Sequence, residues 1–168
     1  MGKGELLILA AAIVIFAMFT VSLTRHQLNI ARTNNEAKIE NYLIAEARSF
    51  LERLEILKFD HQLNDDNTIP FGFVFPDSLT LPDSLGVEAD GLFNDIDDFR
   101  GVFANDTIKI NNTPYYWNYS IHCRVYYVDN NLDSTGVSAP TQKKRVDVIM
   151  KSDYLRNDIT FSRVFSFY

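Results

Sequence analysis

The sequence of 168 residues has few of the residues that cross-link or interrupt a chain. A single cysteine, Cys123, excludes a disulfide within the chain, so the C-terminal part must be held in place by packing. No proline precedes Pro70, and no glycine lies between Gly4 and Gly72. Because proline and glycine are the residues that most weaken a helix, the stretch from Met1 to about Phe59 can form one uninterrupted helix.

The sequence also lacks the short motifs that mark common enzymes. It contains no phosphate-binding loop, nucleophile elbow or metalloprotease helix. Its net charge of -6 disfavours a general affinity for nucleic acid or anionic lipid. The one dense basic patch, residues 143–145, is interpreted as a solvated strand end. We therefore expect a protein that is not an enzyme, needs no cofactor and has no nucleic-acid partner.

What the sequence does contain is a long apolar run, residues 6–23, without a single charge. As a helix this run spans about 27 Å, close to the ~30 Å hydrocarbon core of a bilayer. From Arg25 onward apolar residues instead recur every three or four positions, which is typical of a helix with one buried face. They are Leu28, Ala31, Ile39, Leu43, Ala47, Phe50, Leu54 and Leu57. The sequence thus predicts a hydrophobic helix half, residues 1–24, that can sit in a membrane, followed by an amphipathic half.

The C-terminal third changes to a period of two, which is typical of strands with one buried face. In residues 115–128 the odd positions are aromatic or apolar, whereas the even ones include Asn118 and Arg124. Further strands are predicted at about 107–111, 143–151 and 159–168. Arg163 interrupts the last alternation, and we expect it to form an ion pair at a sheet edge or a subunit contact.

Together these patterns predict an α+β fold. The apolar stripe of the helix and the apolar face of the sheet both need a cover, and packing one on the other supplies it. We expect a single folded domain, residues 25–168, in which a connecting loop (about 60–106) joins the helix to an antiparallel sheet (about 107–168).

The N-terminal features resemble those of a mature type IV pilin. The matching features are Met1, Glu5, the apolar run and its amphipathic continuation. Residues 93–101 (FNDIDDFRG) are also similar to a motif of mannose-sensitive haemagglutinin-type pilins. The chain differs from the family's usual pattern at residues 2–4, where apolar side chains are common.

This resemblance implies a structural subunit that is inserted in the bacterial inner membrane and then assembled with copies of itself into an extracellular helical filament. The filament could serve adhesion, motility, DNA uptake or secretion, since these share one subunit plan. A prepilin peptidase and the pilus assembly machinery would be its partners. The implied assembly residues are Met1, which is N-methylated after processing, Glu5, which pairs with the Met1 amine of a neighbouring subunit, and Lys3. Processing after Gly4 is an alternative. The side chains expected to pack the filament core are Leu6, Leu7, Leu9, Ile13, Phe16 and Phe19.

A single-pass anchor for a ligand-binding ectodomain that does not polymerise is a second interpretation of the same apolar run. Glu5 separates the two interpretations, because an ionised carboxylate at that depth is costly unless it is paired. A plain anchor gains nothing from it.

An acidic stretch in the connecting loop is a candidate calcium site, because calcium binds several carboxylate and amide oxygens from a flexible loop. The candidate ligands are Asp90, Asn94, Asp95, Asp97 and Asp98. The alternative is that these residues are solvated and serve turns and caps.

Overall fold

The computed structural model describes residues 2–89, 91–109, 116–134 and 137–167. The chain divides into two compact units, Met1–Ile39 and Glu40–Tyr168. We call the second unit the head. The predicted boundary between residues 24 and 25 marks a change in composition and stays a prediction.

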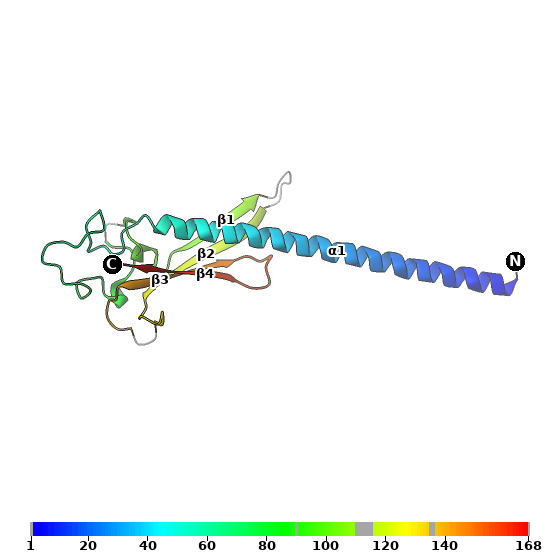
Figure 1. Ribbon diagram of the computed structural model, residues 1–168. Coiled ribbons are helices and arrows are strands. Elements are labelled where there is room, and N and C mark those ends of the chain that lie inside the picture. The colour runs from blue at the N-terminus through cyan, green and yellow to red at the C-terminus, as the bar shows by residue number, and fades with distance from the viewer. Residues whose placement is uncertain (1, 90, 110–115, 135–136, 168) are drawn as a thin grey trace. The chain divides into compact units, whose positions relative to one another are not determined.

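The first element, α1 (Lys3–Leu54), is one long helix (Figure 1). The predicted continuity is confirmed as far as Leu54, as expected of a stretch without proline or glycine. The hydroxyls of Thr20 and Thr24 donate to the carbonyl oxygens of Ala17 and Thr20, each at 2.9 Å. Hydroxyl bonds of this kind can compete with the helix backbone, but here the helix continues unbroken.

The helix ends earlier than predicted, at Leu54 and not near Phe59. The backbone of Lys58 pairs in a parallel bridge with Asp95. The Lys58 N–H donates to the Asn94 carbonyl (3.4 Å), and the Lys58 carbonyl accepts from the Ile96 N–H (3.0 Å). Because a distant segment takes these backbone groups, they cannot extend the helix.

Four antiparallel strands form one sheet in the order β1 (Phe103–Lys109), β2 (Tyr116–Tyr127), β3 (Lys143–Lys151) and β4 (Ile159–Ser166). Strand β3 has the predicted bounds. Strand β1 begins at Phe103 and not near Thr107, because its pairing with β2 starts at the Phe103–His122 pair. Two short 3-10 helices, η1 (Pro82–Ser84) and η2 (Asp97–Phe99), lie in the connection between α1 and β1.

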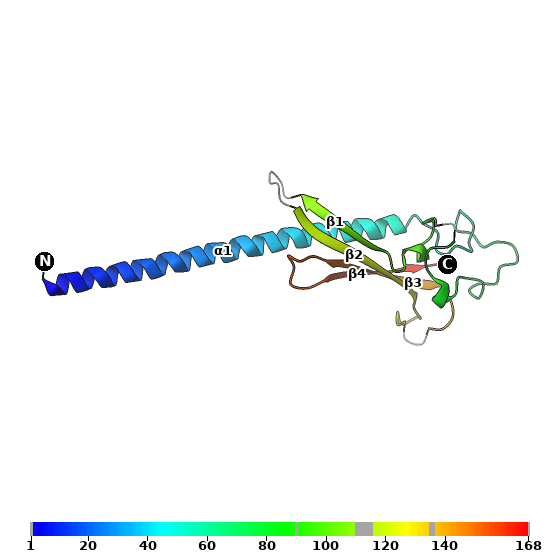
Figure 2. The same cartoon turned by 180° about the vertical axis from the view of Figure 1, so that it is seen from behind.

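Within the head, the last turns of α1 pack on the sheet (Figure 2). Four residues of the predicted stripe are buried there: Leu43, Ala47, Phe50 and Leu54. Leu51, which is not part of the stripe, is buried as well. The Tyr42 ring meets the Tyr119 ring of β2 edge-on, with centroids 6.1 Å apart. The odd positions of β2 from Tyr119 to Tyr127 are also buried, as the alternation predicts. The α+β fold is therefore confirmed.

Aromatic packing holds the C-terminal end where a disulfide is excluded. The Phe167 ring lies 5.8 Å from the Phe59 ring and 5.1 Å from the Phe75 ring, centroid to centroid. The Phe167 N–H also donates to the Gln142 carbonyl at 3.0 Å. On β4, an edge strand, Arg163 forms an ion pair with Glu55, which confirms the expected pair at a sheet edge.

The buried position of Leu54 generates a stability prediction. Leu54 is 2% exposed, so Leu54→Asp would place an unpaired carboxylate in the core of the head. We expect a loss of about 3 kcal/mol or more in the free energy of unfolding, because an uncompensated buried charge is strongly unfavourable. Urea unfolding of the full chain in detergent micelles measures this loss. Ile56→Asp is the matched control, since Ile56 is 85% exposed, and equal stability of the two variants would contradict the packing.

Candidate functional site

The first turn of α1 contains the predicted assembly residues Lys3 and Glu5, whereas Met1 lies outside the described residues. The Oε2 atom of Glu5 accepts a hydrogen bond from the Gly2 N–H at 3.0 Å. A carboxylate at this end of a helix satisfies a free backbone donor and interacts favourably with the helix dipole. Glu5 thus has a partner within its own chain, and pairing with a neighbouring subunit stays a prediction.

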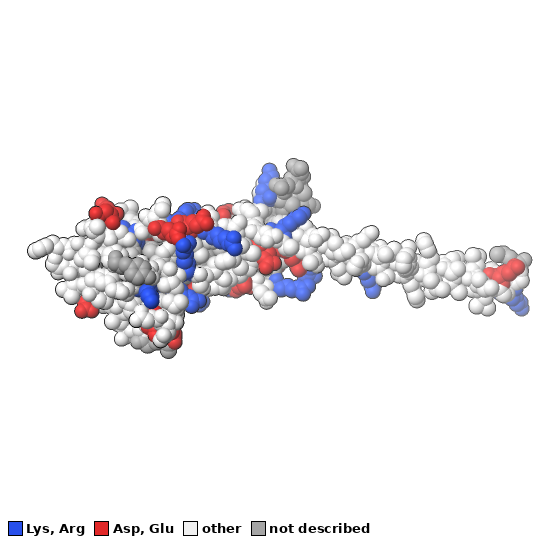
Figure 3. Space-filling view, in the orientation of Figure 1, with Lys and Arg blue, Asp and Glu red and all other residues white. Residues whose placement is uncertain are grey.

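The apolar half of the helix, residues 6–23, is uncovered. The side chains predicted to pack a filament core are all exposed, from 48% for Leu9 to 72% for Leu7; the others are Leu6, Ile13, Phe16 and Phe19. Figure 3 shows this part of the helix as a charge-free surface. The helix is long and apolar enough to cross a membrane, and no part of its most apolar stretch is buried.

In the head, the predicted calcium ligands Asn94, Asp95, Asp97 and Asp98 come together around η2, and Asp90 lies outside the described residues. Asp95, Asp97 and Asp98 are fully buried, so the interpretation as solvated residues is wrong. For Asp95 and Asp98 the expected bonding to nearby backbone groups is confirmed, whereas the Asp97 carboxylate accepts from Lys144. The Asp95 Oδ1 atom accepts from the Asp97 and Asp98 N–H groups, and the Asp98 Oδ2 atom accepts from the Asn94 and Asp95 N–H groups, at 2.7–3.2 Å.

A lysine lies buried beside this loop. Lys144 on β3 is 0% exposed, which corrects its interpretation as part of a solvated strand end. Its ammonium donates three hydrogen bonds, to the Phe59 carbonyl (2.6 Å), Asp60 Oδ2 (2.8 Å) and Asp97 Oδ1 (2.7 Å). All three N–H donors of the ammonium are therefore used.

Asp60 connects this ion pair to the rest of the head. Its carboxylate also accepts from the Thr80 N–H, the Thr80 hydroxyl and the Tyr127 hydroxyl, at 3.0–3.2 Å. Burial raises the pKa of Asp60, but the Lys144 ammonium and the N–H groups of Gln62 and Thr80 lower it by more, so the pKa lies below its ordinary value. The pKa of Tyr127 is raised by burial and by the Asp60 carboxylate, which keeps the hydroxyl a donor.

The sequence analysis named Lys144 only as part of a solvated basic patch, and it did not name Asp60 as a site residue. The sequence did contain one signal for Lys144. In the alternation of β3, Lys144 falls on the same face as Val146, Val148 and Met150, which are buried. A lysine on an apolar face requires a buried acceptor. For Asp60, which follows the helix in a polar stretch, no comparable signal exists.

The single thiol does not supply a nucleophile. Cys123 is 0% exposed, and burial, with a smaller contribution from Asp147, raises its pKa to about 12. The thiol therefore stays protonated near neutral pH, and protonated buried cysteines are inert.

No family model, curated protein or solved structure matches this chain.

The Lys144 ion pair generates a second stability prediction. Lys144→Met would leave Asp60 and Asp97 without their shared ammonium, and breaking a buried pair in this way costs about 3–5 kcal/mol. Lys143→Met is the control, because the Lys143 ammonium bonds the exposed Asn130 side chain at 3.3 Å. We expect this substitution to change the free energy of unfolding by less than about 0.5 kcal/mol. Chemical unfolding of both variants gives the comparison. A Lys144→Met protein as stable as its control would show that the ion pair contributes nothing.

Proposed function

We propose that the chain is a type IV pilin-like structural subunit. In this proposal residues 6–23 first insert in the bacterial inner membrane and later pack with copies of the same segment into an extracellular helical filament. The observation that supports it best is the uncovered apolar half of α1. The role requires no catalysis, no cofactor and no nucleic-acid partner.

The physical argument begins with the apolar surface. Each fully exposed leucine, isoleucine or phenylalanine side chain costs about 1.5–3 kcal/mol relative to a buried one. The apolar half presents such side chains on every side, including Leu7, Ile8 and Phe16 at 72%, 73% and 69% exposure. A helix that is apolar all round needs either lipid or other helices as its surroundings. The bilayer supplies the first and a filament core the second.

Glu5 favours the filament over a permanent anchor. Its carboxylate lies directly before the apolar run, and in a core of packed helices this charge needs a cation close by. The Met1 amine of a neighbouring copy and the Lys3 ammonium are the candidates. Because an ion pair in a dry core is favourable only with close geometry, the contact would fix the axial register between subunits.

The membrane-anchored ectodomain is the second candidate, and the hydrogen bond between Glu5 and Gly2 is the observation that favours it. A carboxylate that caps its own helix at the membrane surface needs no neighbour. In that case Glu5 would serve the helix end alone and the chain would never polymerise.

Replacing Glu5 distinguishes the two candidates. In cells that carry the assembly machinery, we expect Glu5→Ala to reduce the yield of sheared filaments strongly while membrane insertion and the melting temperature of the head stay unchanged. Glu5→Gln should retain part of the yield, because the amide oxygen still accepts a hydrogen bond. Glu36→Ala is a control, since Glu36 forms an exposed pair with Arg32 at 2.9 Å. Normal filaments from Glu5→Ala would remove the main reason to prefer a pilin.

Mass spectrometry of sheared filaments tests the proposal directly. We expect this chain as a component, with a methylated N-terminal amine on Met1; methylation on Glu5 would indicate processing after Gly4. A chain found in membranes and never in filaments would support the anchored ectodomain.

A further inference from the structure

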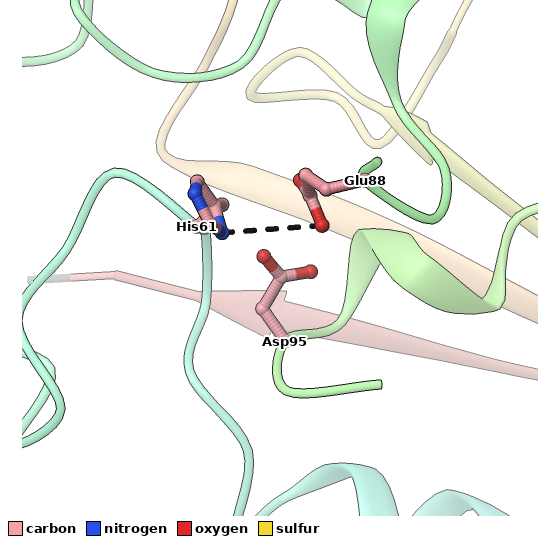
Figure 4. Close-up of side chains that lie close together, drawn as sticks. All are labelled: His61, Glu88 and Asp95. Carbon is pink, nitrogen blue, oxygen red and sulfur yellow. Dashed lines mark ion pairs between the residues drawn. The ribbon is translucent and has the colours of Figure 1, made fainter. Parts of the chain in front are cut away.

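Three side chains from separate segments of the head converge on one point (Figure 4). His61 follows the end of α1, Glu88 lies in the connection after η1, and Asp95 precedes η2. One potential ligand atom from each lies within 4.8 Å of the other two. His61 Nδ1 and Glu88 Oε2 are 3.9 Å apart, which is too long for a hydrogen bond.

Among the described residues, no donor bonds the converging atoms. His61 Nδ1, Glu88 Oε2 and Asp95 Oδ2 are each buried without a hydrogen bond from a described donor, and the carboxyl groups of Asp98 and Asp97 lie beside Glu88 and Asp95. Asp95 is 0% exposed, and its other carboxylate oxygen is held by two backbone N–H groups. The backbone therefore orients this carboxylate so that its free oxygen points at His61 and Glu88. The same loop holds three further buried oxygens without a hydrogen-bond partner, Asn94 Oδ1, Asp97 Oδ2 and Asp98 Oδ1.

The charges around this point do not balance. Lys144 is the buried cation nearby, but its three donors bond the Phe59 carbonyl, Asp60 and Asp97. Glu88, Asp95 and Asp98 receive no hydrogen bond from it. Burial raises the pKa of Asp95 to about 8, with further contributions from a hydrogen bond with the Asp97 side chain and from repulsion by Asp97 and Asp98. Burial and the neighbouring Asp98 also raise the pKa of Glu88. Such groups are stabilised either by protons or by a bound cation.

We propose that His61, Glu88 and Asp95 form a binding site for a first-row transition-metal ion of the zinc class. Imidazole nitrogen together with carboxylate oxygen is a donor set that suits zinc, whereas calcium and magnesium take oxygen ligands. The site differs from the calcium candidate inferred from the sequence, because two of its three ligands lie outside the 90–98 stretch.

The distance between His61 and Glu88 fits this assignment after a small adjustment. Ligands that bind zinc tetrahedrally at about 2.0–2.1 Å lie roughly 3.4 Å from one another. The contact of 3.9 Å between His61 and Glu88 must therefore shorten by about half an ångström. Their side chains are 38% and 24% exposed, which leaves an access route from solvent, while the fully buried Asp95 supplies a fixed ligand. Water or Asp98 would complete the coordination.

Metal binding here would cross-link the head. The three ligands join the end of α1, the connecting segment and the loop before η2, where Lys58 already bridges to Asp95 through its backbone. A chain with one buried cysteine has no disulfide to do this. The inference concerns the fold of the head and is independent of filament assembly.

Metal titration of the full chain in detergent micelles tests the proposal. After treatment with EDTA, we expect added zinc to raise the melting temperature of the head, and cobalt to give a visible absorption band as it becomes bound. His61→Ala, Glu88→Gln and Asp95→Asn should each weaken the affinity, measured by calorimetry, by about tenfold or more. The matched controls are His122→Ala and Asp65→Asn, which replace a histidine and an exposed carboxylate elsewhere in the head and should bind as the wild type does.

Circular dichroism of the metal-free variants shows whether each still folds, and the cobalt spectrum reports on the ligand nitrogen if an affinity change is small. If His61→Ala leaves both the zinc affinity and the cobalt spectrum unchanged, the proposal is overturned. So would a chain that responds to calcium and not to zinc, which would indicate a site made of oxygen alone. No response to any of the three ions would show that protons or an ion pair between His61 and Glu88 stabilise the cluster.

Discussion

The ammonium group of Lys144 is buried on β3, and it can stay charged there only if acceptors replace the water that it has lost. The Phe59 carbonyl and the carboxylates of Asp60 and Asp97 are those acceptors. They come from the segment after α1 and from η2, which lie far from β3 in the sequence. Satisfying one charge therefore fixes three segments against one another. Tyr127 and Thr80 then bond to Asp60, so β2 and the connecting segment join the same network.

The two units of the chain differ in where their charged groups and apolar side chains lie. The head has a core of its own, and its polar network lies inside that core. The apolar half of α1 has no cover within the described chain, and it is long and apolar enough to cross a membrane. This difference separates the two proposals physically: filament assembly depends on residues 6–23 and Glu5, whereas metal binding depends on His61, Glu88 and Asp95. Loss of one therefore leaves the other intact.

Much of the fold follows from local patterns. A stripe at steps of three and four placed Leu43, Ala47 and Leu54 in the core, and the alternation of apolar residues placed β2 and β3. These patterns are readable because a helix and a strand repeat over short distances along the chain. The two errors in element bounds, the end of α1 and the start of β1, have a common cause. At both places backbone groups bond to a distant segment, as Lys58 does to Asn94 and Ile96, and no local pattern records that pairing.

The sequence by itself determined that residues 6–23 need apolar surroundings, that no disulfide forms within the chain, and that a helix and a sheet share a core. These properties depend on composition and period, which the unfolded chain already carries. Only the tertiary structure decided that Lys144 is buried and that His61, Glu88 and Asp95 meet. The three residues meet because of the path that the segment between α1 and β1 takes over the sheet, and long-range contacts determine this path. Residues 61, 88 and 95 have no regular spacing in the sequence that could indicate it.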